Sequence, residues 1–303
     1  MFVISVILSI IVLHHDECNS HSMAAPVVPL PPPKALIEKG RNAKFTNSKH
    51  RMAVLVPYRD RFEELMEFVP YMHSFLSNQY VNHNIFILNQ VDQYRFNRAS
   101  LINAGFQLTK NNHDYIAMHD VDLLPMNTNL SYAYPENPVH LAAPTLHPRY
   151  HYEKFIGGIL LINKEHFELV NGLSNKYWGW GLEDDEFYVR LKDAHLNITR
   201  PQNITTGTSD TFRHIHGTQR KRDTVKCYNQ REVTRRRDRN TGLHDVKFEV
   251  ASYKNMEIEG APFTVINIHL YCNLTTTPWC DCKQQKSASN KQLQPHGKLP
   301  KAK

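Results

Sequence analysis

The sequence predicts an α/β fold in which helices cover a mostly parallel central sheet. Short apolar runs alternate with segments of helical periodicity from residue 51 to residue 122, an order that favours parallel strands joined by crossover helices. The chain has 303 residues, of which 41% are hydrophobic, so it can bury a sizeable core. No internal repeat interrupts this order, and a repeat architecture is therefore not expected.

The first strand and helix follow from local chemistry. Residues 53–56 are apolar and predict a short buried strand that stops at Pro57. Residues 61–76 carry apolar side chains at helical spacing, which predicts a helix. Its first turn holds Glu63 and Glu64, where negative charge suits the helix dipole.

The later elements continue the alternation. Residues 83–90 predict a second strand, residues 96–110 a second helix and residues 114–122 a third strand. The sequence "GGILLI", residues 157–162, predicts a further strand with two glycines at its entrance, where a backbone often approaches a ligand closely.

The expected sheet places its ligand site at one edge. In doubly covered α/β sheets ligands bind outside the carboxyl ends of the strands. The segments 57–59 and 120–122 both fall at such ends, so they are expected to share one cleft.

Four regions make up the chain. Residues 1–15 form an apolar segment, shorter than the roughly 20 residues that span a bilayer, and are expected to be a cleaved signal peptide or a truncated signal anchor. Residues 16–50 are proline-rich and polar, typical of an extended stem. Residues 51–282 form the globular domain, and residues 283–303 a basic disordered tail. Four N-x-S/T sequons agree with the secretory pathway: Asn129, Asn197, Asn203 and Asn273.

The positive charge is local. The formal net charge is +7, but nine lysines and arginines against three acids lie within 220–239, and six lysines without an acid within 283–303. Two basic segments indicate solvated loops or a site for phosphate or polyanion rather than a duplex-binding face, so no nucleic-acid partner is expected. The run 220–239 could also close over a leaving nucleotide diphosphate or steer an anionic acceptor.

Five cysteines are too few for a disulfide scaffold. Cys272, Cys280 and Cys282 lie close together near the C-terminus. In an oxidising compartment a Cys272–Cys280 disulfide would close the last loop. A zinc knuckle is the alternative, although no histidine spacing of the matching kind accompanies the cysteines.

Two pairs of polar residues suggest a metal site. Asp120 and Asp122 are two apart at the end of an apolar strand and would point the same way, as would His214 and His216 on a second strand. Ile215 would enter the core between the histidines. One carboxylate with two imidazoles suits Mn²⁺ better than Mg²⁺. Each pair taken alone is also compatible with a structural role.

The most specific stretch is "YWGWGLEDDEFYVRL", residues 177–191. Two tryptophans separated by glycine precede four acids, a composition that suits a sugar site, and the acids open a helix. The alternative, an acidic helix start, does not explain the tryptophans. Tyr150 and Tyr152 could form an aromatic wall of the same site, or could simply pack.

These motifs identify a family resemblance. "VPYRDR", "FNRASLINAGF", "HDVDLLP", "GGILLI" and "WGWGLEDDEF" resemble the β-1,4-galactosyltransferases in order and spacing, over roughly residues 51–282. The H-x-H pair and "TPWC" are similar to the branch that acts on xylosylated proteins. The resemblance implies a GT-A-like nucleotide-sugar transferase fold, UDP-galactose as donor, Mn²⁺ as cofactor, a xylosylated proteoglycan core protein as acceptor, and a type II anchor in the Golgi membrane.

The resemblance also implies roles for individual residues. Asp184 would be the catalytic base, and Asp122, His214 and His216 would hold the metal. The implied donor contacts are Pro57, Tyr58, Arg59, Arg61, Phe96, Arg98, Asp120, Val121, Trp180 and Glu183. The implied acceptor contacts are Tyr150, Tyr152, Trp180 and Asp185. Leu182 departs from the family, whose members often carry a polar or charged residue there.

Three functions are therefore considered. The first is inverting transfer of galactose from UDP-galactose to the 4-hydroxyl of xylose, with Asp184 as base and no covalent intermediate. The second keeps the family but changes the acceptor to N-acetylglucosamine or the donor to an N-acetylated sugar. The third is a UDP-sugar-binding protein without turnover, against which the intact Asp184 argues.

Overall fold

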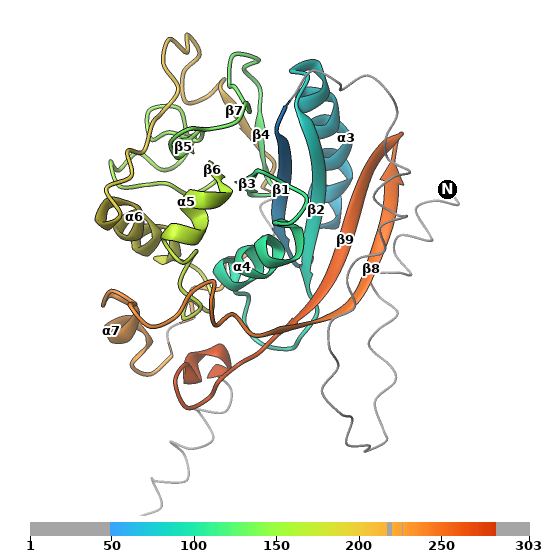
Figure 1. Cartoon of the computed structure of the whole chain (residues 1–303). Helices are drawn as coiled ribbons and strands as arrows, with labels where there is room; N and C mark the ends of the chain where they lie inside the picture. Colours follow the sequence, from blue (N-terminus) through green and yellow to red (C-terminus); the bar gives the residue numbers. More distant parts are fainter. Residues whose placement is uncertain (1–48, 217–219, 226, 283–303) are drawn as a thin grey trace, which may run out of the picture. The chain divides into compact units, whose positions relative to one another are not determined.

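The computed structural model describes residues 49–216, 220–225 and 227–282, all within one compact unit of the chain (Figure 1). The predicted leader, the tail and nearly all of the stem lie outside the described residues. Within the described part, no helix combines the length and apolarity that a bilayer crossing requires.

A seven-stranded sheet forms the centre, in the order β5-β6-β3-β1-β2-β9-β8. Its strands are β1 (Arg51–Tyr58), β2 (Asn82–Gln90), β3 (Tyr115–His119), β5 (Val139–His140), β6 (Ile159–Asn163), β8 (Phe248–Ile258) and β9 (Ala261–Leu270). The four central strands, β3, β1, β2 and β9, are parallel, as predicted, whereas β5, β6 and β8 are antiparallel to their neighbours. A second sheet pairs β4 (Leu123–Pro125) with β7 (Phe212–His214).

The helices and short turns complete the described elements: α3 (Phe62–Asn78), α4 (Arg98–Thr109), α5 (Lys164–Leu169), α6 (Glu183–Asp193), α7 (Gln230–Thr234) and the 3₁₀ turn Pro278–Cys280. The crossover from β1 to β2 and the crossover from β2 back to β3 run in opposite directions across the sheet. Since parallel crossovers are right-handed, α3 and α4 lie on opposite faces (Figure 1). The direction changes between β1 and β3, where a ligand cleft is expected.

Two predicted strand ends are wrong. The first strand does not stop at Pro57 but continues to Tyr58, because β3 pairs with β1 only as far as Leu55 and therefore needs no N–H from Pro57. The third strand ends at His119 instead of residue 122, so Asp120 and Asp122 lie in the turn that follows.

Two further local predictions differ from the structure. β6 begins at Ile159, and the glycine pair therefore precedes the strand instead of opening it. β7 ends at His214, so Ile215 and His216 lie beyond the strand and Ile215 is only half-buried rather than in the core. The acids of residues 183–186 form the first turn of α6, which begins at Glu183.

The C-terminal cysteines form disulfides. Cys272 is bonded to Cys280, as the first alternative proposed, and Cys227 is bonded to Cys282 across 55 residues. The zinc-knuckle alternative is therefore wrong. The long-range disulfide ties the segment after the histidine pair to the end of the domain.

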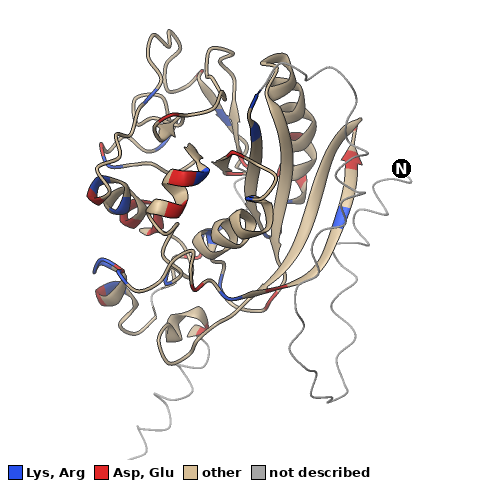
Figure 2. Cartoon of the chain, in the orientation of Figure 1, with Lys and Arg blue, Asp and Glu red and all other residues tan. Residues whose placement is uncertain are grey.

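The basic run is interleaved with acids (Figure 2). Arg220 pairs with Glu64 of α3, and Asp223 accepts from Arg95 at 2.7 Å. Near α7, Arg236 pairs with Glu232, and Arg237 pairs with Asp193 of α6. These ion pairs attach the run to several elements of the domain.

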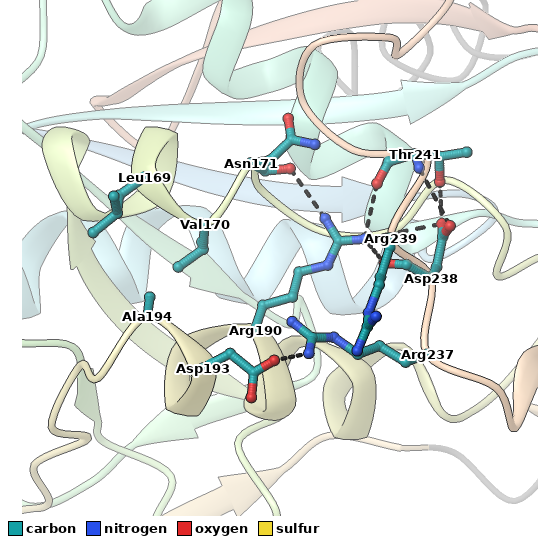
Figure 3. Close-up of a pocket in the computed structure, with 10 residues that line it drawn as sticks. All are labelled: Leu169, Val170, Asn171, Arg190, Asp193, Ala194, Arg237, Asp238, Arg239 and Thr241. Carbon is teal, nitrogen blue, oxygen red and sulfur yellow. Dashed lines mark hydrogen bonds and ion pairs between the residues drawn. The ribbon is translucent and has the colours of Figure 1, made fainter.

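Asp238 is the buried centre of the loop after α7. Its carboxylate accepts from Ser174 Oγ (2.6 Å) and from Lys176 Nζ (2.9 Å), and it is 4% exposed. The guanidinium of Arg190 on α6 donates to the carbonyls of Asp238 and Thr241 beside a cavity of about 360 Å³ (Figure 3). Burial alone would raise the pKa of Asp238, but the hydrogen bonds outweigh it and lower the pKa to about 2.

We expect Asp238→Ala to lower the free energy of unfolding by about 3–5 kcal/mol, because it leaves the Lys176 charge without its buried partner. A carboxylate whose pKa is lowered by folding stabilises above its ordinary pKa, and this contribution is lost as pH falls toward 2. The difference from wild type should therefore shrink below pH 4. Denaturant unfolding at pH 7 and pH 3 measures it, with the exposed Asp210→Ala as control; equal losses in both variants would contradict the prediction.

Candidate active site

Three side chains converge on one point beside the sheet. The Oδ2 atom of Asp122 lies 3.1 Å from Nδ1 of His216 and 3.6 Å from Nε2 of His214. One possible ligand atom from each residue lies within 4.8 Å of the others. Leu123 on β4 is paired with His214 on β7, and this short ribbon brings together residues some 90 positions apart in sequence.

The donor set of this cluster fits a divalent transition metal. One carboxylate oxygen and two imidazole nitrogens suit Mn²⁺. The other ring nitrogen of His214, Nδ1, is buried and has no hydrogen-bond partner among the residues that the structure describes. Burial lowers the pKa of His214, which favours the neutral imidazole that a metal ligand must be.

The two aspartates do not point the same way. Asp122 belongs to the histidine cluster, whereas Oδ1 of Asp120 accepts a hydrogen bond from Nε of Arg98 at 2.9 Å. The same guanidinium reaches Oδ1 of Asp184 at 3.3 Å. Arg98 thus connects the turn after β3 with the first turn of α6.

Asp184 lies in an environment that disfavours its charge. Burial and the adjacent Glu183 raise its pKa well above the usual range, and Asp120 and Asp185 add to this. The Arg98 guanidinium opposes the shift without cancelling it. The pKa of Glu183 is raised as well, chiefly by burial. A carboxylate with a raised pKa is suited to take a proton near neutral pH.

Gly157 makes room for this carboxylate. A Cβ atom placed on Gly157 would overlap Oδ2 of Asp184. The carbonyl of Gly157 is also held, at 2.9 Å, by Nε2 of the buried His140. The absence of a side chain at Gly157 therefore leaves room for the carboxylate of Asp184.

We expect Gly157→Ala to reduce kcat by about 10²-fold, because the added methyl group displaces Asp184 by a distance of the order of 1 Å. Nucleotide affinity should remain within a few-fold of wild type, since the cluster at Asp122 is not touched. Steady-state kinetics and nucleotide titration separate the two quantities. Gly207→Ala, where a Cβ meets nothing within 4 Å, is the control. An unchanged kcat in Gly157→Ala would refute the argument.

Several of the predicted donor contacts lie at the end of β1 and beside it. Tyr58 is buried, and burial raises its pKa to about 12. Its hydroxyl has no hydrogen-bond partner in the described part of the chain. The guanidinium of Arg59 donates to the carbonyls of Gln90 and Tyr94 and lies 6.0 Å from the ring of Phe96. Arg59 therefore holds the loop between β2 and α4. The remaining predicted residues around this edge are Pro57 at the end of β1, Arg61 at the start of α3 and the buried Val121.

The predicted acceptor wall contains a residue that sequence reasoning missed. Trp180 is 53% exposed, and the guanidinium carbon of Arg222 lies 5.0 Å from its ring and 5.6 Å from that of Tyr150. The hydroxyl of Tyr152 lies near the carboxyl group of Asp185, whose pKa is raised by burial. Arg222 was only one member of a basic run, and nothing in its sequence neighbourhood singled it out.

The sequon asparagines, Asn129, Asn197, Asn203 and Asn273, are all exposed. Leu182 precedes α6 with a left-handed backbone (φ 74°) and a half-exposed side chain.

Comparisons with known proteins agree on one family. Residues 34–135 match the N-terminal region of glycosyl transferase group 7, and residues 137–215 match the N-terminal domain of galactosyltransferase. Beta-1,4-galactosyltransferase 7 of Drosophila melanogaster is 60% identical over 246 residues, which cover 80% of this chain and 76% of the relative. The xylosylprotein 4-beta-galactosyltransferase of Caenorhabditis elegans is 52% identical over 239 residues, 77% of this chain and 83% of the relative.

Solved structures extend the comparison to the fold. The catalytic domain of the Drosophila enzyme in complex with xylobiose superposes with a TM-score of 0.76 at 62% identity, covering 77% of this chain and 99% of that one. A mutant of that enzyme, in complex with manganese, UDP-Gal and xylobiose, gives the same TM-score at 61% identity with the same coverage.

Proposed function

Because this chain belongs to the β-1,4-galactosyltransferase family, we propose its function from what the family's reaction requires of the residues in the cleft. The chain is a xylosylprotein 4-β-galactosyltransferase of the GT-A fold. It transfers galactose from UDP-galactose to the 4-hydroxyl of xylose on proteoglycan core proteins, with inversion and with Mn²⁺ as cofactor. The observation that carries this proposal is the convergence of Asp122, His214 and His216 beside a buried carboxylate cluster.

The metal site is assigned to these three residues. Asp122, His214 and His216 would hold Mn²⁺, which when bound neutralises charge that develops on the diphosphate oxygens. Arg98 lies between the two halves of the cleft and bonds both Asp120 and Asp184. We assign it to orienting the base relative to the donor.

Asp184 is assigned as the general base. Its Oδ1 is bonded to Arg98, and its Oδ2 has no hydrogen-bond partner among the described residues, so Oδ2 is the oxygen available for a proton. It takes the proton of the xylose 4-hydroxyl as that oxygen forms a bond to C1 of galactose. The bond from C1 to the diphosphate oxygen breaks, and its electron pair leaves with UDP.

Sugar binding is assigned to the residues around the aromatic wall. Trp180, Tyr150 and Tyr152 offer ring faces to the acceptor xylose, and Asp185 offers a carboxylate next to Tyr152. Glu183 and Trp180 line the donor sugar. Nucleotide binding remains assigned to the residues around the end of β1: Pro57, Tyr58, Arg61 and Val121. It is also assigned to Phe96, whose ring faces the guanidinium of Arg59. The exposed sequons and the two disulfides support an oxidising lumenal compartment, and we place the enzyme in the Golgi, anchored by the N-terminal segment.

An acceptor panel tests this function. The described domain with Mn²⁺ and UDP-galactose should galactosylate β-xylosides and leave β-N-acetylglucosaminides essentially unmodified. The same panel with UDP-N-acetylgalactosamine tests the donor. Transfer to N-acetylglucosaminides but not to xylosides would overturn the acceptor assignment, and binding of UDP without any transfer would favour a protein that has lost turnover.

A further inference from the structure

Phe155 is a buried aromatic residue in the loop between β5 and β6, and no step of the proposed reaction uses it. It is 4% exposed, so its ring offers almost no surface to a ligand. Four aromatic rings pack against it, with these distances between ring centroids: Tyr150 (4.9 Å), His147 (5.1 Å), His140 (5.3 Å) and Tyr152 (5.6 Å). Two of these rings, those of the tyrosines, belong to the predicted acceptor wall.

The wall tyrosines depend on Phe155 for their orientation. Tyr152 is 47% exposed, and in the described part of the chain Phe155 supplies the only aromatic ring that packs against it, edge to face at 62°. The backbone N–H of Phe155 also donates to the carbonyl of Tyr152 at 3.0 Å. Aromatic pairs stabilise a preferred geometry beyond the effect of the area that they bury. Phe155 therefore helps to fix the direction in which the wall faces.

The same ring borders the carboxylate of Asp184. A Cβ atom placed on Gly157 would overlap both Oδ2 of Asp184 and Cε2 of Phe155, so these two atoms lie beside the same small space. Nε2 of His140 holds Gly157 by donating to its carbonyl at 2.9 Å, and the His140 ring packs edge to face against Phe155. Protein interiors are close-packed and contain few voids. Loss of the Phe155 ring would therefore open space beside the carboxylate of Asp184.

We propose that Phe155 is a positioning residue of the transfer reaction, whose ring fixes the acceptor wall and the carboxylate of Asp184 relative to each other. The inference rests on the proposed function, which assigns xylose binding to the wall and proton removal to Asp184. Xylose must lie against the wall with its 4-hydroxyl at this carboxylate, and a misplacement of about 1 Å can cost about 10²-fold in rate. A single buried ring that packs against both parts is suited to hold this separation.

Phe155→Leu removes the ring and keeps a buried apolar side chain. Because the wall and the base both lose support, we expect the KM for a β-xyloside to rise about 10-fold and kcat to fall about 10–10²-fold. The dissociation constant of UDP with Mn²⁺ should be unchanged, since none of the ring contacts of Phe155 involves the metal cluster. Steady-state kinetics at saturating UDP-galactose and calorimetry with UDP, both on the full chain, measure these quantities.

A purely structural role of Phe155 would give a different result. It would lower the folded fraction, and with it the apparent kcat, but it would leave the KM for the xyloside unchanged. Phe75→Leu is the matched control, because Phe75 on α3 is also buried and packs against Tyr71 and Tyr132, neither of which is assigned to the site. This control should have a lower melting temperature and a wild-type KM.

Two further variants make the outcome specific to the ring. Phe155→Tyr keeps the aromatic ring and should recover most of the wild-type KM and kcat. If Phe155→Leu does not fold, Phe155→Met carries the test, since methionine fills irregular core space without a flat ring.

The possible results distinguish this inference from the proposed function. A folded Phe155→Leu variant with a wild-type KM overturns the inference, whether or not its apparent kcat falls, and leaves the galactosyltransferase assignment intact. If wild type uses N-acetylglucosaminides and ignores xylosides, a raised KM for that acceptor in Phe155→Leu supports the inference, while the acceptor assignment is overturned. A wild-type protein that transfers galactose to no acceptor overturns both.

Discussion

Asp184→Asn is expected to abolish transfer to xylosides while UDP binding with Mn²⁺ is retained. Removal of a general base typically lowers the rate on the order of 10²–10⁴-fold, and the amide cannot take the proton of the acceptor hydroxyl. The variant should fold normally, because an uncharged group at this buried position avoids the desolvation that raises the pKa of Asp184. Initial rates and UDP titration on the same preparation give both quantities.

The pH dependence provides a second measurement on the same residue. Asp184 works only as a carboxylate, and its pKa in the fold is raised. The wild-type rate is therefore lost as pH falls through this raised pKa, at a higher pH than an exposed carboxylate would give. Because folding raises the pKa of Asp184, the buried negative charge destabilises the wild-type protein increasingly as pH rises. The melting temperature of Asp184→Asn should therefore equal or exceed that of wild type at pH 7, and should not exceed it at low pH.

Asp185→Asn is the matched control for this base. It carries the same chemical change one position further along α6, where the carboxyl group lies near the hydroxyl of Tyr152. We expect a higher KM for xyloside with a kcat within about 10-fold of wild type. Retained turnover in Asp184→Asn, or a greater loss of kcat in Asp185→Asn, would refute the assignment of the base.

Alanine at His214 or at His216 should weaken Mn²⁺ binding at least about 10–100-fold, the range known for groups that only support metal ligands. Both imidazoles lie within reach of Oδ2 of Asp122, and each variant removes one nitrogen of the set. The concentration of Mn²⁺ at half-maximal activity should rise in both variants, and saturating Mn²⁺ should restore part of the rate.

A histidine with comparable burial outside the cluster provides the control. His113 is buried, and its ring nitrogens are bonded to the carbonyl of Thr109 and to Asn84 on β2. His113→Ala should lower the melting temperature without changing the Mn²⁺ requirement of the protein that remains folded. Identical Mn²⁺ titrations for wild type and the His214 and His216 variants would make those two histidines structural.

Much of the architecture could be predicted because local rules decide it. The apolar runs and the helical periodicity between residues 51 and 122 are short-range patterns, and the elements they predicted are present with shifts of a few residues at their ends. The ends shifted where a neighbouring strand decided them: β1 passes through Pro57 because β3 stops pairing at Leu55. The antiparallel direction of β5, β6 and β8 was not predicted, since the direction of pairing depends on where the chain returns to the sheet.

The candidate site, too, was predicted only in part from the sequence. Composition and spacing alone determined the kinds of groups that would be present: paired carboxylates, paired imidazoles and tryptophans beside acids. Only the tertiary structure decided which of them meet. It separated Asp120 from Asp122, joined Asp120 to Asp184 through Arg98, and placed Gly157 against the carboxylate of Asp184. The physical reason is that hydrogen bonds and steric exclusion act between neighbours in space, and a turn of two residues after β3 is enough to reverse the direction of a carboxylate that strand periodicity alone would have assigned.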